Sequence, residues 1–301
     1  MSLELLVDLC DYSGALIAEK GAPVNFPLIH TFMDHGKRLK KNCYRVGETS
    51  LFKNFKNIFN EEKYFAIFAP PDDNERIASI IKNAAITKEI NAELAFMREN
   101  LPYTFRHTLL VTALTIKIML DATKGEDYNY ETAALIGLTH DIGKSRVPKQ
   151  ILGKTTPLKK SEYELLKTHS LISYLLLCYY LGNAYNDVIN AVRDHHEKLD
   201  GIGYPRGVTK ISKYTKVIVA ADIFDALISE RPYRVSPFSV RQAIDYLINQ
   251  SGAGRIDKDV VYRLISYVRK EHPNPADLSP YTNQPFRERP DSCYGRIIPD
   301  D

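Results

Sequence analysis

The feature of this chain that most constrains its fold and chemistry is the clustering of its histidines. Five of the eight histidines lie in one interval, which runs from His107 to Asp222. The residues of this interval that we select as candidate metal ligands are His107, His140, Asp141, His169, His195, His196 and Asp222. Imidazole and carboxylate groups are ligands for divalent first-row transition metals. The interval therefore predicts a metal site.

The number of candidate ligands indicates two metals. Five histidines and two aspartates are more than one tetrahedral site can use, and they suit two metals that share a bridging carboxylate. Such a site activates water and clamps the attacking and leaving oxygens of a phosphoryl transfer. Any one of these histidines alone could be an ordinary core or surface residue. The set could not, because adjacent His-Asp and His-His pairs on apolar helices would bury polar groups without partners.

Three longer motifs extend these pairs. They are HDIGK at residues 140–144, HHEKLDGIGYP at residues 195–205, and ADIFDAL at residues 221–227 followed by RPYR at residues 231–234. In this order they resemble the signatures of the HD-GYP family of bacterial cyclic-di-GMP phosphodiesterases, over roughly residues 100–265. A lone His-Asp pair would be a weak signal, whereas three long motifs in the right order are specific.

The resemblance implies a fold, a reaction and a set of ligands. The fold is mainly α, an HD-type helical bundle with the site in its core. The reaction is hydrolysis of cyclic-di-GMP to linear pGpG, to GMP or to both, by a hydroxide that a binuclear metal centre activates. The two divalent metals are iron, with manganese as the alternative. His107, His140, Asp141 and Asp222 would hold one metal, and His169, His195 and His196 the other, with Asp141 as the bridge.

The same resemblance gives candidates for contact with the substrate. They are Lys144, Gly203, Tyr204, Pro205, Arg231 and Arg234, and the catalytic residues would be Lys144 and Asp141. A lysine beside the metals is a point charge suited to the scissile phosphate, and its alternative role is a favourable charge at a helix end. Arginine binds phosphate in a fork, although Arg231 and Arg234 could instead form surface ion pairs.

The chain departs from the family pattern in two places. Some family members bind a third metal through a glutamate one helical turn before the first histidine, and Tyr103 holds that position here. We therefore expect two metals. The segment between Gly207 and Asp222 is about two residues shorter than the family pattern, so the loop that faces the substrate should differ.

Three functions compete. The first is an active cyclic-dinucleotide phosphodiesterase. The second is a general HD-type nucleotide phosphohydrolase, which would need only His107, the His-Asp pair and Asp222. The presence of His169, of the pair His195 and His196, and of the Gly-Tyr-Pro loop argues against it. The third is a catalytically weak receptor or docking module, whose Gly-Tyr-Pro loop binds a signalling partner of the GGDEF type. A degenerate receptor should have lost ligands, and all seven are present, so we favour the enzyme.

Composition sets further bounds. The chain of 301 residues could form one large domain or two. Its net charge of only +3 makes no case for a nucleic-acid polymer or a membrane surface, and no apolar run could span a bilayer. The N-terminal residues do not resemble a signal peptide. The four cysteines form no CxxC, so we expect free thiols in the cytoplasm.

The chain is expected to have three parts. Residues 1–70 are predicted to form a small mixed α/β module with a regulatory or partner-binding role, which contains a hairpin around residues 11–14 and a strand at residues 64–68. His30 and His35 are expected to be structural or exposed there, with a sensory role as the alternative. Pro70 and Pro71 mark the boundary to the catalytic domain, residues 71–270. Residues 271–301 form a proline-rich tail.

Apolar periodicity predicts the helices of the catalytic domain. They cover residues 75–99, 105–121, 130–142, 161–181, 185–196, 213–229, 240–248 and 257–269. The first could transmit a signal, pair two subunits in a homodimer, or simply pack on its own domain. Gly143 is expected to end the third in a left-handed turn, and Ser161 with Glu164 to form a capping box.

Overall fold

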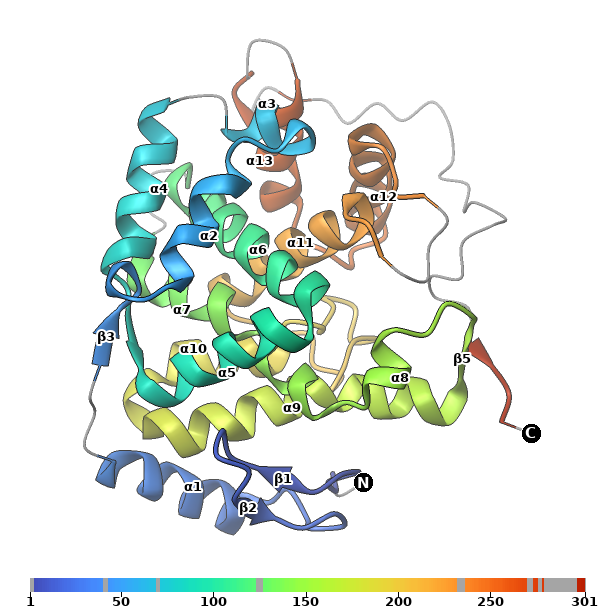
Figure 1. Cartoon of the computed structure of the whole chain (residues 1–301). Helices are drawn as coiled ribbons and strands as arrows, with labels where there is room; N and C mark the ends of the chain where they lie inside the picture. Colours follow the sequence, from blue (N-terminus) through green and yellow to red (C-terminus); the bar gives the residue numbers. More distant parts are fainter. Residues whose placement is uncertain are drawn as a thin grey trace.

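The computed structural model describes residues 3–39, 43–68, 71–122, 127–231, 236–269, 273–275, 278 and 297–300. The chain is mainly α-helical (Figure 1). The α-helices before the site are α1 (Phe26–Arg38), α2 (Leu51–Ile58), α3 (Phe65–Phe68), α4 (Pro71–Asn83) and α5 (Lys88–Asn100). Those that follow are α6 (Pro102–Leu120), α7 (Tyr130–Thr139), α8 (Lys149–Leu152), α9 (Lys160–Leu181), α10 (Asn186–Asp194), α11 (Lys213–Ile228), α12 (Val240–Gly252) and α13 (Lys258–Val268).

Short 3₁₀ helices and strands connect these helices. The 3₁₀ helices are η1 (Val46–Glu48), η2 (Glu62–Tyr64), η3 (Ile142–Arg146) and η4 (Gly182–Tyr185). The strands form three pairs: β1 (Leu9–Cys10) with β2 (Leu16–Ala18), β3 (Cys43–Arg45) with β4 (Ala85–Thr87), and β5 (Leu158–Lys159) with β6 (Ile297–Ile298). The first two pairs are antiparallel and the third is parallel. The predicted N-terminal hairpin and the mainly α fold are confirmed.

The helices that carry the site lie at the centre of the bundle. Helix α6 packs against α7, α5 and α11, and α9 packs against α10 and η3. Helices α7 and α11 are apolar on most of their faces, and such a helix is stable only when other elements cover it on all sides. The apolar sequences around the histidines therefore place the site deep inside the fold.

The N-terminal segment packs directly on this bundle. Leu9, Phe55 and Tyr64 are fully buried and belong to the same hydrophobic core as the central helices. Helix α1 lies along α9 (Figure 1). The expected division at residues 70 and 270 stays a prediction. His30 is exposed, and the ring of His35 stacks on Tyr179 of α9 with the centroids 3.8 Å apart.

A buried polar network joins the N-terminal hairpin to η3. The Arg146 guanidinium donates to both carboxylate oxygens of Glu93, at 2.6 Å each, and to the carbonyl oxygen of Cys10. The Tyr180 hydroxyl donates to Glu93 at 2.7 Å and accepts from the backbone N–H of Tyr12 at 3.0 Å. Glu93 is 1% exposed. A buried carboxylate needs such partners, so the hairpin, α5, α9 and η3 are fixed relative to one another.

Two predicted elements are wrong in type. Residues 64–68 form the end of η2 and helix α3, and not a strand. Tyr64, Ile67 and Phe68 are buried while Phe65 is 66% exposed; this is the spacing of one helical face, and a strand would alternate.

The long helix predicted at residues 75–99 is two helices with β4 between them. Thr87 ends the strand and caps α5, because its hydroxyl accepts from the N–H of Ile90. Both helices do carry the apolar residues of the predicted stripe on their buried faces. The break between them arises because β4 pairs with β3, for example Ala85 with Arg45. Local periodicity cannot indicate a pairing between residues so far apart in sequence.

Three smaller predictions concern helix ends and the tail. Gly143 lies within η3 and is not among the glycines with positive φ, so the left-handed turn predicted there is wrong. The capping box of Ser161 and Glu164 is also wrong: α9 begins at Lys160 and Glu162 accepts from the N–H of Lys159. In the proline-rich tail, Ile297–Ile298 pair with β5 as β6.

Within the described ranges, no helix is both long and apolar enough to cross a membrane.

Helix α1 and η4 approach closely at a pair of glycines, and this contact generates a prediction. A Cβ on Gly36 would lie 2.3 Å from the backbone nitrogen of Gly182 and 2.8 Å from the carbonyl oxygen of Cys178. We expect Gly36→Ala to lower the free energy of unfolding by about 1–3 kcal/mol, because overpacking forces the backbones apart. Urea denaturation measures this change.

The matched control is Gly252→Ala at the end of α12, where an added Cβ would meet no atom within 4 Å. That variant should equal or exceed the stability of the wild type, by up to about 1 kcal/mol. Equal stability of the Gly36→Ala protein and the wild type would contradict the close approach of α1 to η4.

Candidate metal centre

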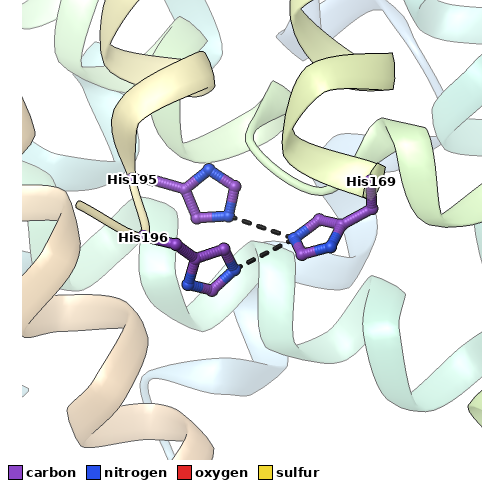
Figure 2. A group of neighbouring side chains, drawn as sticks. All are labelled: His169, His195 and His196. Carbon is purple, nitrogen blue, oxygen red and sulfur yellow. Dashed lines mark hydrogen bonds between the residues drawn. The ribbon is translucent and has the colours of Figure 1, made fainter. Parts of the chain in front are cut away.

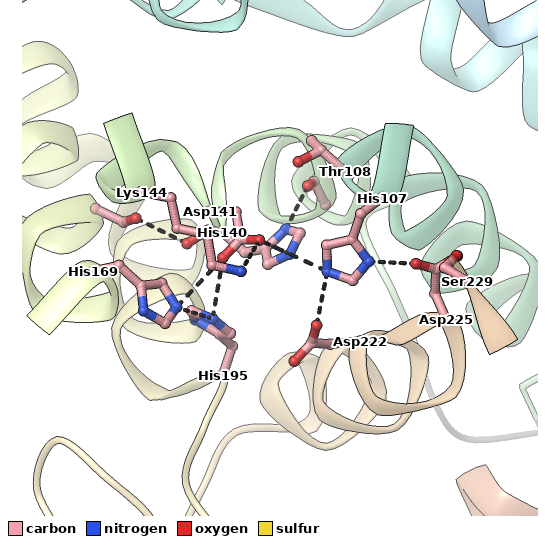
Figure 3. Close-up of polar contacts among 12 residues, drawn as sticks. His107, Thr108, His140, Asp141, Lys144, His169, His195, Asp222, Asp225 and Ser229 are labelled. Atoms are coloured by element: carbon pink, nitrogen blue, oxygen red, sulfur yellow. Dashed lines mark hydrogen bonds and ion pairs between the residues drawn. The ribbon is translucent and has the colours of Figure 1, made fainter. Parts of the chain in front are cut away.

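The fold brings all seven predicted ligands together: Figure 3 shows six of them, and Figure 2 shows His196 beside His169 and His195. Helix α6 supplies His107, and α9 supplies His169. His140 and Asp141 lie between the end of α7 and η3, His195 and His196 directly follow α10, and Asp222 lies on α11. Except for His196, which is partly buried, their side chains are at most 9% exposed. Each of these residues lies at the centre because the apolar residues of its helix, or of the helix it follows, are buried in the core.

The Asp141 carboxylate lies between two groups of imidazoles. Its Oδ2 is 3.5 Å from His140 Nε2 and 3.7 Å from His107 Nε2. Its Oδ1 is 3.4 Å from His169 Nε2 and 3.9 Å from His195 Nε2. One oxygen therefore faces each group, which is the arrangement that a bridging carboxylate requires.

The second group is formed by three histidines that point at one another (Figure 2). His169 Nε2 lies 3.0 Å from His196 Nε2 and 3.3 Å from His195 Nε2. Asp222 joins the two groups, because its Oδ1 is 2.9 Å from His107 Nε2 and its Oδ2 is 3.8 Å from His196 Nδ1. Ring nitrogens this close repel one another unless a proton or a cation lies between them.

The backbone fixes the tautomer of three of these imidazoles. His140 Nδ1 contacts the carbonyl oxygen of Gly137 at 2.8 Å, and the Nδ1 atoms of His169 and His195 contact the carbonyls of Leu166 and Val192 at 2.6 Å each. A carbonyl oxygen only accepts, so each Nδ1 must carry the proton. In the neutral ring the lone pair is then on Nε2, the atom that faces the centre. This is how proteins orient histidines toward a metal.

The residues fit a pair of metal ions. His107, His140 and Asp141 offer ligand atoms that all lie within 4.8 Å of one another, and so do His169, His195 and His196. Among the described residues, His140 Nε2 and Asp141 Oδ1 are buried polar atoms without a hydrogen-bond partner. Such orphaned atoms are costly, and a cation placed among these donors would satisfy both.

Burial keeps most of these imidazoles neutral. It lowers the pKa of His140 to about 4 and that of His169 to about 3, with the charge of Lys144 adding to the effect at His169. Burial also lowers the pKa of His195 and of His196. Burial alone would raise the pKa of the Asp141 carboxyl, but the positive charge of Lys144 holds it well below its usual value. Neutral imidazole and ionised carboxylate are the forms that bind metals.

The predicted substrate residues are placed as follows. Lys144 Nζ donates to Asp141 Oδ2 at 2.5 Å, so its charge lies at the centre. The ring of Tyr204 stacks on His196 with the centroids 4.7 Å apart, which places the loop of Gly203 and Pro205 against the second group. The Arg231 guanidinium lies 3.8 Å from Asp225 Oδ2, measured from Nη2. Arg234 lies outside the described residues.

Glu197 is a residue of the site that sequence reasoning missed. Its carboxylate is fully buried and accepts from three successive backbone N–H groups, those of Arg206 at 2.6 Å and of Gly207 and Val208 at 3.1 Å each. Glu197 therefore holds the Gly-Tyr-Pro loop in place. Its position next to His196 in the motif was the available signal, but the backbone partners could not be read from it.

Asp225 was missed as well. Its Oδ2 contacts His107 Nδ1 and its Oδ1 accepts from the hydroxyl of Tyr64 (Figure 3 draws the contact with His107). Burial alone would lower the pKa of His107, but the carboxylates of Asp225 and Asp222 raise it. Burial alone would raise the pKa of the Asp225 carboxyl, but His107, together with Arg231 and the Tyr64 hydroxyl, lowers it. Asp225 lies three residues after Asp222, on the same face of α11, and that spacing was its only sequence signal.

Comparisons with known proteins agree with this geometry. A family model described as HD domain matches residues 89–260, more than half of the chain. A 3'3'-cGAMP-specific phosphodiesterase of Vibrio cholerae is 35% identical over 52% of this chain and 36% of its own length. Cyclic di-GMP phosphodiesterases of Pseudomonas aeruginosa and Thermotoga maritima are 34% and 33% identical over 50% of this chain, and over 37% and 40% of their own lengths. The chain thus covers well under half of these relatives.

The buried imidazoles predict that the metal-free protein loses stability on acidification. The pKa values of about 4 for His140 and about 3 for His169 lie below the ordinary value of 6.5, so the unfolded chain binds more protons between these limits. Stability should fall as the pH drops from about 6.5 toward 4, by about 1.4 kcal/mol per pH unit for each extra proton. The raised pKa of His107 acts only above pH 6.5, and the lowered pKa values of Asp141 and Asp222 act only below 3.8.

Urea denaturation in the presence of a chelator, at several pH values in this window, measures the slope. His169→Gln should make it shallower, because one imidazole that loses its proton on folding is gone. His30→Gln should change the slope less than His169→Gln does, since His30 is exposed on α1. A stability that does not change between about pH 6.5 and about pH 4.5 would contradict the neutral state of these imidazoles.

Proposed function

Because the chain belongs to the HD domain family, we propose that it is a metal-dependent phosphodiesterase that hydrolyses a cyclic dinucleotide. The observation that carries the proposal is the position of Asp141, whose two oxygens each face a separate group of imidazoles. A two-metal arrangement of this kind is used for in-line displacement at phosphorus. The catalytic unit would comprise residues 71–270 and work in the cytoplasm.

In this proposal the ligands divide into two sets. One ion would be held by His107, His140, Asp141 and Asp222, and the other by His169, His195 and His196, with Asp141 shared. Iron is the preferred metal and manganese the alternative, because imidazole and carboxylate suit both. When bound, such ions lower the pKa of a water and neutralise charge on phosphoryl oxygens.

The residues of the chain would then act on the substrate directly. Lys144 is held beside Asp141, so its ammonium can neutralise the charge that builds on the phosphoryl oxygens. The loop that Glu197 holds in place would contact the dinucleotide through Gly203, Tyr204 and Pro205. Arg231 contacts Asp225, so we assign it to the support of the site more readily than to phosphate binding.

The substrate we propose is cyclic-di-GMP, which would be hydrolysed to linear pGpG, to GMP or to both. Support comes from the relatives, whose names assign them cyclic di-GMP or 3'3'-cGAMP as substrate. The second candidate is a catalytically weak receptor whose loop docks a signalling partner of the GGDEF type. The observation that favours it is the 66% exposure of Ile202, the residue directly before Gly203 of the Gly-Tyr-Pro loop. The complete set of ligands favours the enzyme.

The test is hydrolysis of cyclic-di-GMP by protein purified without oxygen and supplied with Fe(II) or Mn(II), alongside metal quantitation. We expect turnover and about two metal ions per chain. Replacing both His195 and His196 by Ala should abolish turnover, because the second ion loses two of its three histidines. His30→Ala is the matched control and should keep full activity, since His30 is exposed.

Each other outcome has a definite meaning. Two ions without turnover of cyclic-di-GMP or 3'3'-cGAMP would shift the assignment to the receptor. A content near three ions per chain would contradict the two-metal count that rests on Tyr103. Activity that survives the double replacement would mean that the site is assigned to the wrong residues.

The role of Lys144 gives a separate prediction. Lys144→Met should lower kcat by about 10²–10³-fold, the effect of removing one group that stabilises charge in the transition state, while the metal content stays near two. Lys149→Met is the control, because Lys149 lies on α8 and contacts Asn100 instead of the site. An unchanged kcat in the Lys144→Met protein would leave Lys144 with its alternative role, a favourable charge at a helix end.

A further inference from the structure

Buried hydrogen bonds connect the Nδ1 side of His107, which faces away from the candidate metal centre, to Asp225, Tyr64 and Ser229. His107 Nδ1 contacts Asp225 Oδ2, and the other oxygen of Asp225 accepts from the hydroxyls of Tyr64 and, at 3.0 Å, Ser229. Asp225 and Tyr64 are fully buried, and Ser229 is 3% exposed. Figure 3 shows Asp225 and Ser229 on the far side of His107 from Asp222.

Tyr64 does not come from the bundle that carries the ligands. It lies in η2, within the segment expected to be a separate N-terminal module, and it is 161 residues from Asp225 in sequence. Two neighbours of Tyr64 also reach the same end of α11, Lys63 directly and Glu61 through Arg106. Lys63 Nζ donates to the carbonyl oxygen of Ile228 at 3.2 Å, and Glu61 pairs with Arg106, which donates to Ser229 Oγ at 3.2 Å.

These contacts fix the C-terminal end of α11. That end carries Asp225, and Asp222 lies one turn before it. A buried carboxylate that accepts hydrogen bonds on one oxygen is held in one rotamer, and its other oxygen then holds the imidazole in one tautomer and orientation. The Tyr64 hydroxyl is therefore part of what aims His107 Nε2 at the centre.

We propose that Tyr64 is a positioning residue of the metal centre, acting through Asp225 on His107, so that the N-terminal segment is a structural part of the site. This inference rests on the proposed function for its metal, and not for its substrate. Tyr64 acts on the ligands through Asp225 and His107 and does not contact a metal-binding atom itself. Its effect should therefore be confined to the ion that His107 binds. An ordinary core tyrosine would instead influence both ions equally, through stability alone.

The experiment measures the affinity of the full-length protein for Mn²⁺, by calorimetric titration of the metal-free form. Tyr64→Phe removes only the hydroxyl. Removing a direct outer hydrogen-bond partner of a ligand usually costs about 10–100-fold in metal affinity. Tyr64 acts one residue further out, through Asp225, so we expect one of the two Mn²⁺ affinities to weaken by about 10-fold, while the other affinity is unchanged. Where turnover is measurable, kcat should fall and KM should stay constant.

The matched control is Tyr267→Phe. Tyr267 is also buried, and its hydroxyl lies 3.4 Å from the carbonyl oxygen of Lys117 instead of near the centre. It should lower stability without changing either Mn²⁺ affinity. Ser229→Ala removes the other hydroxyl from the same oxygen of Asp225, so it should weaken the same Mn²⁺ site as Tyr64→Phe does.

A double-mutant cycle isolates the route through Asp225. In an Asp225→Asn background, Tyr64→Phe should change the Mn²⁺ affinity far less than it does in the wild type. Unchanged affinities in Tyr64→Phe, or equal weakening of both sites, would overturn the proposal. These results differ from failure of the proposed function, which would appear as intact Mn²⁺ binding by the wild type without hydrolysis of any cyclic dinucleotide.

Discussion

The structure depends on one buried carboxylate. Asp141 is 1% exposed and ionised, and a buried charge is tolerated only where opposite charges and donors surround it. Lys144 supplies one positive charge at Oδ2, while Oδ1 faces imidazoles that burial keeps neutral. A cation between the carboxylate and the rings would supply the remaining attraction. The apolar burial of the surrounding helices places those rings around the carboxylate.

Helix ends supply the geometry of two of the rings. His140 directly follows α7 and His195 directly follows α10. The last carbonyls of a helix lack partners within the helix, and the Nδ1–H groups of these two histidines donate to such carbonyls, at Gly137 and Val192. The same hydrogen bond therefore completes the helix and fixes the tautomer of a ligand. A histidine at this position needs no further residue to aim its Nε2.

The N-terminal segment supports the centre from two sides. On one side, Tyr64 contacts Asp225 behind His107. On the other, the carbonyl of Cys10 accepts from Arg146, at the end of the 3₁₀ helix that carries Lys144. Both contacts are buried or nearly so and connect residues more than 100 positions apart. A displacement of this segment would therefore reach the ligands of the site through hydrogen bonds already present.

The sequence by itself determined the candidate ligands and most of the helices that carry them, because ligand chemistry depends on residue type and apolar periodicity is local. His107, the HDIGK run and the double histidine could all be selected in this way. Where a distant partner competes with periodicity, as at β4, the sequence was misleading. Only the tertiary structure decided which oxygen of Asp141 faces which imidazoles, and that Glu197, Asp225 and Tyr64 support the site. The reason is physical: a hydrogen bond between Tyr64 and Asp225, 161 residues apart, exists only after the core has brought the two side chains together, and no local pattern specifies it.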